Sequence, residues 1–255
     1  MPYNVEQKPF SYDEYRTIIS KYKPTVCDYA EVFNKTSFSI IRHDVEFSPH
    51  DAVEIAKIDH ELGISSTFFF QTNSGAYNLS SFKNQERLRF IDSLGHHVGL
   101  HFYVTQLEEN DWKGLYQELD RQTEILAIAL GQRIDRFSFH RPPKWALARR
   151  EDYMNGMINA YGPSFFEFTL DCQPGNIKYF ADSNHQWKYG YALDEFPHQQ
   201  YQILLHPDEW SQAGCVLSEN FKRIIHISNH EYFNVLKKEY LNFPVEIEDE
   251  FTLSR

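Results

Sequence analysis

The segment FSIIRHDVEFSPHDAVEIAKIDHELG (residues 38–63) decides the expected fold of this chain. Its first residues are apolar and β-branched, and they predict a strand over Phe38–Arg42. A helix is expected to follow, because Ser48 is a good N-cap, Pro49 suits the first turn and Asp51 completes an acidic capping box. One broad apolar stripe continues through the helix, and Gly63 is expected to end it. The segment is therefore predicted to be one strand–helix unit.

The same alternation of short apolar runs and longer helical patterns continues along the chain. Further strands are expected at Thr67–Phe70, Val98–His101, Arg136–Phe139, Phe166–Leu170, Ile177–Phe180 and Tyr201–Leu205. Further helices are expected at Gln85–Leu94, Glu108–Leu130 and Glu219–Leu241. Alternating strands and helices are typical of βαβ units around a parallel sheet. We therefore predict an α/β fold, a distorted (β/α) barrel of about seven units, in one domain spanning residues 1–255.

Composition excludes several classes of partner. The formal net charge of the 255-residue chain is −11 and its pI is about 5.5, which argues against nucleic acid and against an anionic membrane surface. No apolar run approaches the length of a membrane span, and the first residues do not resemble a signal peptide. Three widely spaced cysteines do not form a disulfide pattern. A reducing, cytoplasmic location is therefore expected.

Polar side chains follow four of the expected strands. The first strand runs into His43 and Asp44, and later strands end in His101, in His140 with Arg141, and in His206. Because the carboxyl ends of parallel strands surround the active site in barrels, these side chains are expected to converge. About three His and Asp side chains around one point form the ligand set of a catalytic, Zn²⁺-like divalent ion, and a further His can act as general acid. Metal-assisted hydrolysis of an ester or amide is the predicted reaction class.

These residues lie in segments that resemble the polysaccharide deacetylases of carbohydrate esterase family 4, and more closely a divergent branch associated with surface-polysaccharide biosynthesis. The matching segments are IIRHDVEFSP (40–49), LGISSTFFFQT (62–72), LGHHVGLHF (94–102), SFHRPP (138–143), YFADSNHQW (179–187) and LLHP (204–207). They follow one another in the family's order over residues 40–207.

The resemblance implies a role for each matched position. The family's first motif is a pair of aspartates, a general base followed by a metal ligand, so Asp44 matches the ligand and His43 occupies the position of the base. His101 matches the first histidine of a ligand pair whose second member would fall at Thr105. Arg141, before two prolines, matches the arginine that orients the base.

Two later motifs complete the site that the resemblance implies. His206 matches the family's general acid, and Asp182 and Trp187 match residues that shape the wall of the site. Because Thr105 is a poor ligand, His140 is expected to be the third ligand, with His185 as the alternative. The predicted metal site is therefore Asp44, His101 and His140.

Two features are left open by the residues themselves. Glu46 is interpreted either as a carboxylate behind the ligands or as part of the loop before the helix. His226 and His230 share a helix face, which is typical of a solvated surface as well as of a metal pair.

The resemblance implies hydrolytic removal of an N-acyl group, acetyl in the simplest case, from an amino sugar in a cell-surface polysaccharide or lipopolysaccharide O-antigen pathway. With no export signal expected, the substrate is predicted to be a cytoplasmic precursor that is nucleotide-linked, lipid-linked or a short oligosaccharide. Two alternatives remain. One is a non-catalytic sugar-binding protein on the same fold, and the other is a metal amidohydrolase that acts on a non-sugar amide.

Overall fold

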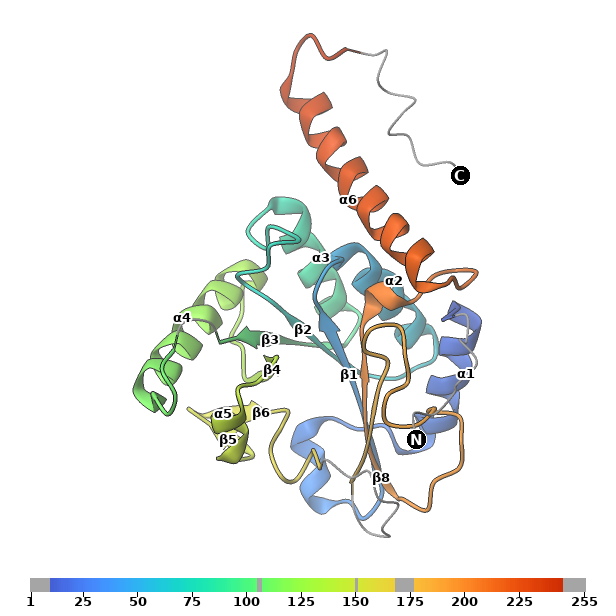
Figure 1. The fold of residues 1–255 in the computed structure, drawn as a ribbon, viewed down its shortest axis with the longest axis vertical. Helices are drawn as coiled ribbons and strands as arrows, with labels where there is room; N and C mark the ends of the chain where they lie inside the picture. The colour runs from blue at the N-terminus through green and yellow to red at the C-terminus, as the bar shows by residue number, and fades with distance from the viewer. Residues whose placement is uncertain (1–9, 105–106, 150, 168–176, 245–255) are drawn as a thin grey trace.

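The computed structural model describes residues 10–104, 107–149, 151–167 and 177–244, and they form one eight-stranded sheet flanked by helices (Figure 1). The order of strands across the sheet is β5-β6-β4-β3-β2-β1-β8-β7. Their bounds are β1 Phe38–Val45, β2 Thr67–Phe70, β3 His97–Tyr103, β4 Arg136–His140, β5 Tyr153–Met154, β6 Met157–Asn159, β7 Ile177–Ala181 and β8 Gln200–Leu205.

Neighbouring strands of the sheet are parallel, except for the antiparallel pair of β5 and β6. The sheet is curled into a half-barrel, and helices pack against it, so the predicted distorted (β/α) barrel is confirmed. Strands β1 and β8 pair in parallel although about 160 residues separate them in the chain, with His43 opposite Leu205. This pairing brings the first and the last predicted motifs to neighbouring strand ends.

The helices are α1 Tyr12–Tyr22, α2 Pro49–Glu61, α3 Phe82–Ser93, α4 Trp112–Leu130, α5 Lys144–Ala148 and α6 Leu217–Glu239, with short 3₁₀ segments η1 Lys23–Thr25, η2 Tyr29–Asn34 and η3 Pro207–Glu209. Four of the helices correspond to predicted ones, α2, α3, α4 and α6, whereas α1 and α5 were not predicted. The Ser48 side chain caps α2 by accepting a hydrogen bond from the backbone N–H of Asp51, as expected. Helix α4 begins later than predicted, because Asp111 caps it by accepting from the N–H of Gly114.

One predicted strand and one observed hairpin differ from the expectation. Phe166 and Glu167 form no strand, and the rest of the predicted strand Phe166–Leu170 lies outside the described residues. The hairpin of β5 and β6 was not predicted. Its turn residues Asn155 and Gly156 both have positive φ, 51° and 75°, which is the conformation that a two-residue hairpin turn requires.

The core lies between the sheet and its helices. Every residue of β1 is buried, as expected for a central strand of a parallel sheet that is covered on both faces. Gly99 in β3 has a packing role, since a Cβ there would lie 2.5 Å from the Phe69 ring and 2.8 Å from the Arg136 side chain. In the described part of the chain, no helix combines the length and the hydropathy that a membrane span requires.

Candidate metal centre

The alternation of side chains along β1 decides on which face of the sheet each of its polar residues lies. Successive residues of a strand point to opposite faces, so Arg42 and Asp44 share one face and His43 lies on the other. Glu46 follows directly after the strand ends at Val45, and its side chain reaches the ends of β3 and β4. The side of β1 that enters the site is thus formed by Arg42, Asp44 and Glu46.

Glu46 meets two histidines at this end of the sheet. Its Oε1 lies 2.7 Å from Nδ1 of His140 and 3.3 Å from Nε2 of His101. The two imidazole nitrogens are 3.1 Å apart. Burial alone would raise the pKa of Glu46, but the hydrogen bonds from His101 and His140 outweigh it and hold the pKa well below its ordinary value. Glu46 is therefore an ionised carboxylate beside two imidazoles.

The His101 ring is held from behind by a chain of polar contacts. Its Nδ1 lies 2.8 Å from Oγ of Ser138, which in turn donates to Asp44 at 3.2 Å. Asp44 accepts two hydrogen bonds from the Arg42 guanidinium, at 2.9 and 2.7 Å. Burial alone would raise the pKa of Asp44, but Arg42 and His101 hold it below its ordinary value. This chain directs Nε2 of His101 toward Glu46.

A second histidine–carboxylate pair stands next to the cluster. Nδ1 of His206 lies 2.6 Å from Asp182, which also accepts hydrogen bonds from the backbone N–H of His206 and from Nε1 of Trp210. Nε2 of His206 lies 3.9 Å from Oε1 of Glu46. Burial lowers the pKa of His206, but Asp182, and behind it Glu46 and Asp44, outweigh burial and raise the pKa to about 10. His206 is therefore a protonated group facing the cluster.

The donor set fits a divalent ion of the zinc type. Glu46, His101 and His140 each offer one ligand atom, and these atoms all lie within 4.8 Å of one another. Bonds of about 2.0–2.1 Å in tetrahedral geometry require ligand atoms roughly 3.3 Å apart, close to the three separations given above. Two imidazoles and one carboxylate form a ligand set of catalytic zinc sites, in which the fourth position stays open.

The structure brings together only some of the predicted site residues. Asp44 lies behind His101, in contact with Arg42. It is not among the three residues whose ligand atoms converge on one possible metal position. His101 and His140 converge with Glu46 in the part of the chain that the structure describes. Thr105 lies outside the described residues.

His43 faces away from the cluster, and Arg141, which directly follows His140, does not make the contact with Asp44. Nε2 of His43 is 3.0 Å from Asp59 of α2 and 3.3 Å from the Tyr15 hydroxyl of α1, and its ring stacks on Phe68. His43 is thus buried on the helix side of the sheet. Arg141 is exposed and has a φ of 49°, and the guanidinium that contacts Asp44 belongs to Arg42 instead.

In the segment after β7, one predicted residue contacts the site and two contact residues elsewhere. Asp182 contacts His206 as described, whereas Trp187 stacks with Phe10 in the core. Both ring nitrogens of His185 are engaged at 2.7 Å, one by Glu209 and one by the carbonyl oxygen of Cys215. The contacts of His185 and Trp187 described above are with residues outside the cluster, so their predicted site roles rest on the motif alone.

Sequence reasoning leaves the role of Glu46 open and misses three residues of the site, Arg42, Ser138 and Trp210. The alternation along β1 and β4 was the available signal, since it puts Arg42 beside Asp44 and Ser138 beside His140. No comparable signal exists for Trp210, which reaches Asp182 from beyond η3.

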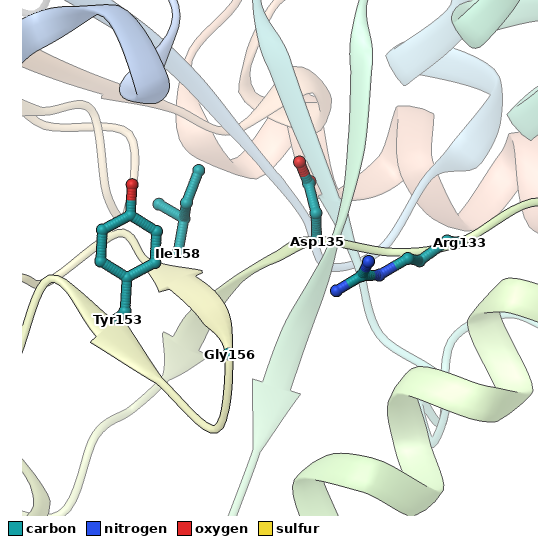
Figure 2. Close-up of a pocket in the computed structure, with 5 residues that line it drawn as sticks. All are labelled: Arg133, Asp135, Tyr153, Gly156 and Ile158. Atoms are coloured by element: carbon teal, nitrogen blue, oxygen red, sulfur yellow. The ribbon is translucent and has the colours of Figure 1, made fainter.

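Two hollows in the surface help to place the site. One, of about 460 Å³, is lined by residues of the loop after β2, namely Thr72, Ser74, Gly75, Ala76, Tyr77, Asn78 and Leu79, and Ser74 of this loop donates a hydrogen bond to the backbone carbonyl oxygen of Glu46. Figure 2 shows another, of about 410 Å³, between the β5–β6 hairpin and the residues before β4, with Tyr153 and Arg133 on its sides. The second hollow lies at the amino end of β4, whereas the metal-binding candidates lie at the carboxyl ends of the strands.

No family model and no curated protein sequence matches this chain. Solved structures do show similarity. A family 4 carbohydrate esterase-type (CE4) pseudoenzyme from Bacillus anthracis is 15% identical, with a TM-score of 0.45, over 78% of this chain and 62% of that one. A family 4 carbohydrate esterase from Streptomyces lividans, in complex with acetate, is 15% identical, with a TM-score of 0.41, over 75% and 86% of the two chains.

The chitin deacetylase from the fungal pathogen Colletotrichum lindemuthianum is also 15% identical, with a TM-score of 0.40, over 74% of this chain and 81% of that one. The chain spans 62–64% of the length of the Bacillus anthracis pseudoenzyme in three of its structures, two of which are of mutants. The chain is thus similar in structure, at low identity, to proteins of carbohydrate esterase family 4, the family that its sequence motifs resemble.

Proposed function

We propose that this chain is a metal-dependent hydrolase that removes an N-acyl group from an amino sugar. The observation that supports this most directly is the cluster of Glu46, His101 and His140 beside the His206–Asp182 pair. Hydrolysis of an amide needs polarisation of the carbonyl, an activated water and a proton for the leaving amine. The two groups of residues match these requirements.

In this proposal, Glu46, His101 and His140 bind the metal ion, and His206 transfers the proton. A divalent ion bound by Glu46, His101 and His140 would act as a Lewis acid on the acyl carbonyl and lower the pKa of water. Ser138, backed by Asp44, holds the ring of His101 in the orientation for binding. In this proposal, Glu46 takes the ligand position that the motif predicts for Asp44.

His206 is proposed as the general acid, in agreement with its motif. Asp182 accepts from Nδ1 and leaves Nε2 directed toward Glu46, where a leaving amine would lie. Its high pKa keeps the ring protonated at neutral pH, which is the state that a proton donor needs before reaction. The base role predicted for His43 finds no support in its contacts, since the ring faces Asp59 and Tyr15.

The substrate class is inferred from the motifs. An acetylated amino sugar that is nucleotide-linked, lipid-linked or part of an oligosaccharide, in a surface-polysaccharide or O-antigen pathway, fits the resemblance to polysaccharide deacetylases. The half-buried ring of Tyr103, edge-on to His140, offers an aromatic surface beside the cluster.

Metal content and acetate release test the proposal together. The chelator-treated chain, dialysed against Zn²⁺, is expected to bind one ion per chain by elemental analysis. Glu46→Gln is expected to remove this binding, and Asp44→Asn is expected to weaken it by about 10–100-fold, as for residues that support a ligand. Glu209→Gln, which alters a buried glutamate paired with His185, is the matched control. If Asp44→Asn abolished binding and Glu46→Gln did not, the ligand set predicted from the motif would be the correct one.

Acetate release is then measured on acetylated amino sugars and, separately, on acetylated amino acids. Release from the sugars alone supports the proposal, and release from the amino acids alone identifies a non-sugar amidohydrolase. Zinc binding without release from any substrate identifies the non-catalytic alternative, for which the orientation of His43 away from the cluster is the favouring observation. Absence of both binding and release would overturn the proposal.

A further inference from the structure

Helix α6 is linked to the rest of the protein by ion pairs. Figure 1 shows that it extends from η3 past α2 and α3 and projects beyond the sheet. Arg223 binds Asp51 of α2, and Glu231 binds Lys83 and Arg87 of α3. Ion pairs therefore link α6 to α2 and α3, and the helix also carries buried Phe233 and half-buried Ile224 and Ile227.

Another side of α6 exposes large apolar residues to solvent. The exposed fractions are 53% for Phe221, 59% for Ile225, 66% for Tyr232 and 55% for Val235. Their spacings of four, seven and three residues place them in one stripe along the helix. A continuous apolar patch on the surface usually marks a contact with another molecule. Helix α6 thus exposes an apolar stripe in addition to the side that faces the body of the protein.

The stripe is nearly palindromic about Ser228. Phe221 lies seven residues before Ser228 and Val235 seven residues after it, while Ile225 lies three before and Tyr232 four after. Reversal of the helix therefore superposes apolar positions on apolar positions. A twofold contact has the same property, because residue i of one copy meets residue j of the other and residue j meets residue i.

We propose that α6 pairs antiparallel with α6 of a second copy of this chain, with the twofold axis at Ser228. Phe221 then lies opposite Val235 of the second copy, and Ile225 lies opposite Tyr232. Ser228 is exposed and small, so the two helices can approach closely where they cross.

Charge favours a second copy as the occupant, and the available area sets the expected strength of the pairing. The four exposed side chains offer on the order of 400 Å² per copy, hence about 800 Å² for the pair, given the roughly 150–250 Å² that an aromatic side chain can bury. This is below the approximately 1,200 Å² of stable interfaces and indicates a weak, concentration-dependent dimer. Helix α6 has four Lys or Arg and three Glu, so two copies repel little, whereas the net charge of −11 for the whole chain opposes binding to an anionic membrane.

Sedimentation velocity of the full chain over micromolar to several hundred micromolar concentrations tests the proposal. The mass is expected to rise from 30.3 kDa toward twice that value as the concentration increases. Ile225→Glu is expected to raise the dimer dissociation constant at least tenfold. Asn234→Glu, the control, adds the same charge at an exposed position on the opposite side of the helix and is expected to leave dimerisation unchanged.

A cysteine placed at the proposed axis tests the register. Ser228→Cys is expected to give a covalent dimer under mild oxidation, and Asn234→Cys and the unmodified chain are expected to give little. A chain that stays monomeric at all concentrations would overturn the proposal, as would a dimer that neither Ile225→Glu nor Ser228→Cys affects. Binding to anionic phospholipid vesicles that Ile225→Glu abolishes, without any dimer, would assign the stripe to a membrane surface and overturn it equally.

Discussion

The pairing of His206 with Asp182 leads to a quantitative prediction for the variant Asp182→Asn. Asp182 is the strongest of the groups that raise the pKa of His206 from 6.5 to about 10, against the lowering effect of burial. An opposite charge at hydrogen-bond distance shifts a pKa by about 1–3 units. We therefore expect the pKa of His206 in the metal-free chain to fall by roughly two to three units in Asp182→Asn, because Glu46 and Asp44 remain.

The same shift changes how stability depends on pH. A histidine whose pKa is higher in the folded state contributes stability that is complete below the unfolded pKa of about 6.5 and is lost as the pH rises through about 10. The full displacement is worth about 5 kcal/mol at about 1.4 kcal/mol per unit. Asp182→Asn is expected to remove about 3–4 kcal/mol of this pH dependence, while it also destabilises the chain at all pH values through the changed hydrogen bonds to Trp210 and the His206 N–H.

Titration of the histidine ring signals by NMR, with urea unfolding between pH 6 and pH 10, measures both effects. The control is Glu209→Gln, because Glu209 raises the pKa of another buried histidine, His185, through a contact of 2.7 Å that resembles the 2.6 Å contact of Asp182 with His206. This control is expected to lower the pKa of His185 and to leave His206 unchanged. A His206 pKa near 6.5 in the unmodified chain, or one that stays near 10 in Asp182→Asn, would refute the reasoning.

Three further predictions follow from other contacts. Ser138→Ala is expected to lower the affinity for Zn²⁺ by about 10–100-fold in a competition assay with a fluorescent chelator, because His101 loses the contact that orients it; an unchanged affinity would remove Ser138 from the site. His43→Gln is expected to lower the free energy of unfolding by about 1–3 kcal/mol in urea, since Asp59 loses a buried partner. The same variant is expected to leave the affinity for Zn²⁺ and the pH profile of turnover unchanged. Loss of the acidic limb of that profile would restore His43 as the base. Gly99→Ala is expected to cost about 1–3 kcal/mol in the same unfolding assay, because its Cβ would lie 2.5 Å from the Phe69 ring, and a neutral result would show that Phe69 can move aside.

The strand–helix alternation was predictable because local signals specify it. Ser48, Pro49 and Gly63 mark the ends of α2 in the sequence as they do in the structure. The β5–β6 hairpin was also within reach, since Asn155-Gly156 is the preferred pair for such a turn, but its strands have only two and three residues and show no periodicity. The start of α4 was misplaced by a few residues, because Asp111 is itself a good cap.

The sequence predicts which strand ends meet at the candidate site, but it predicts less well which side chains contact one another there. Convergence of His101, His140 and His206 follows from parallel strands, whose carboxyl ends meet at one edge. In the proposed site, Glu46 takes the ligand position predicted for Asp44, because Arg42 binds both oxygens of Asp44 and Glu46 contacts the histidines instead. Pairing between side chains on one strand face depends on rotamers, which sequence alone does not specify.

The placement of β8 has a consequence for synthesis of the chain. Strand β1 pairs with β2 on one side and with β8 on the other, and β8 is about 160 residues further along. While the chain emerges from the ribosome, one edge of β1 therefore has no partner until residues 200–205 are available, and such an edge can pair with other chains. Contacts of this sequence separation also form slowly. A nascent chain that stalls before Gln200 would therefore expose the unpaired edge of β1, which can associate with other chains. We expect chaperones to act on this protein chiefly in that interval.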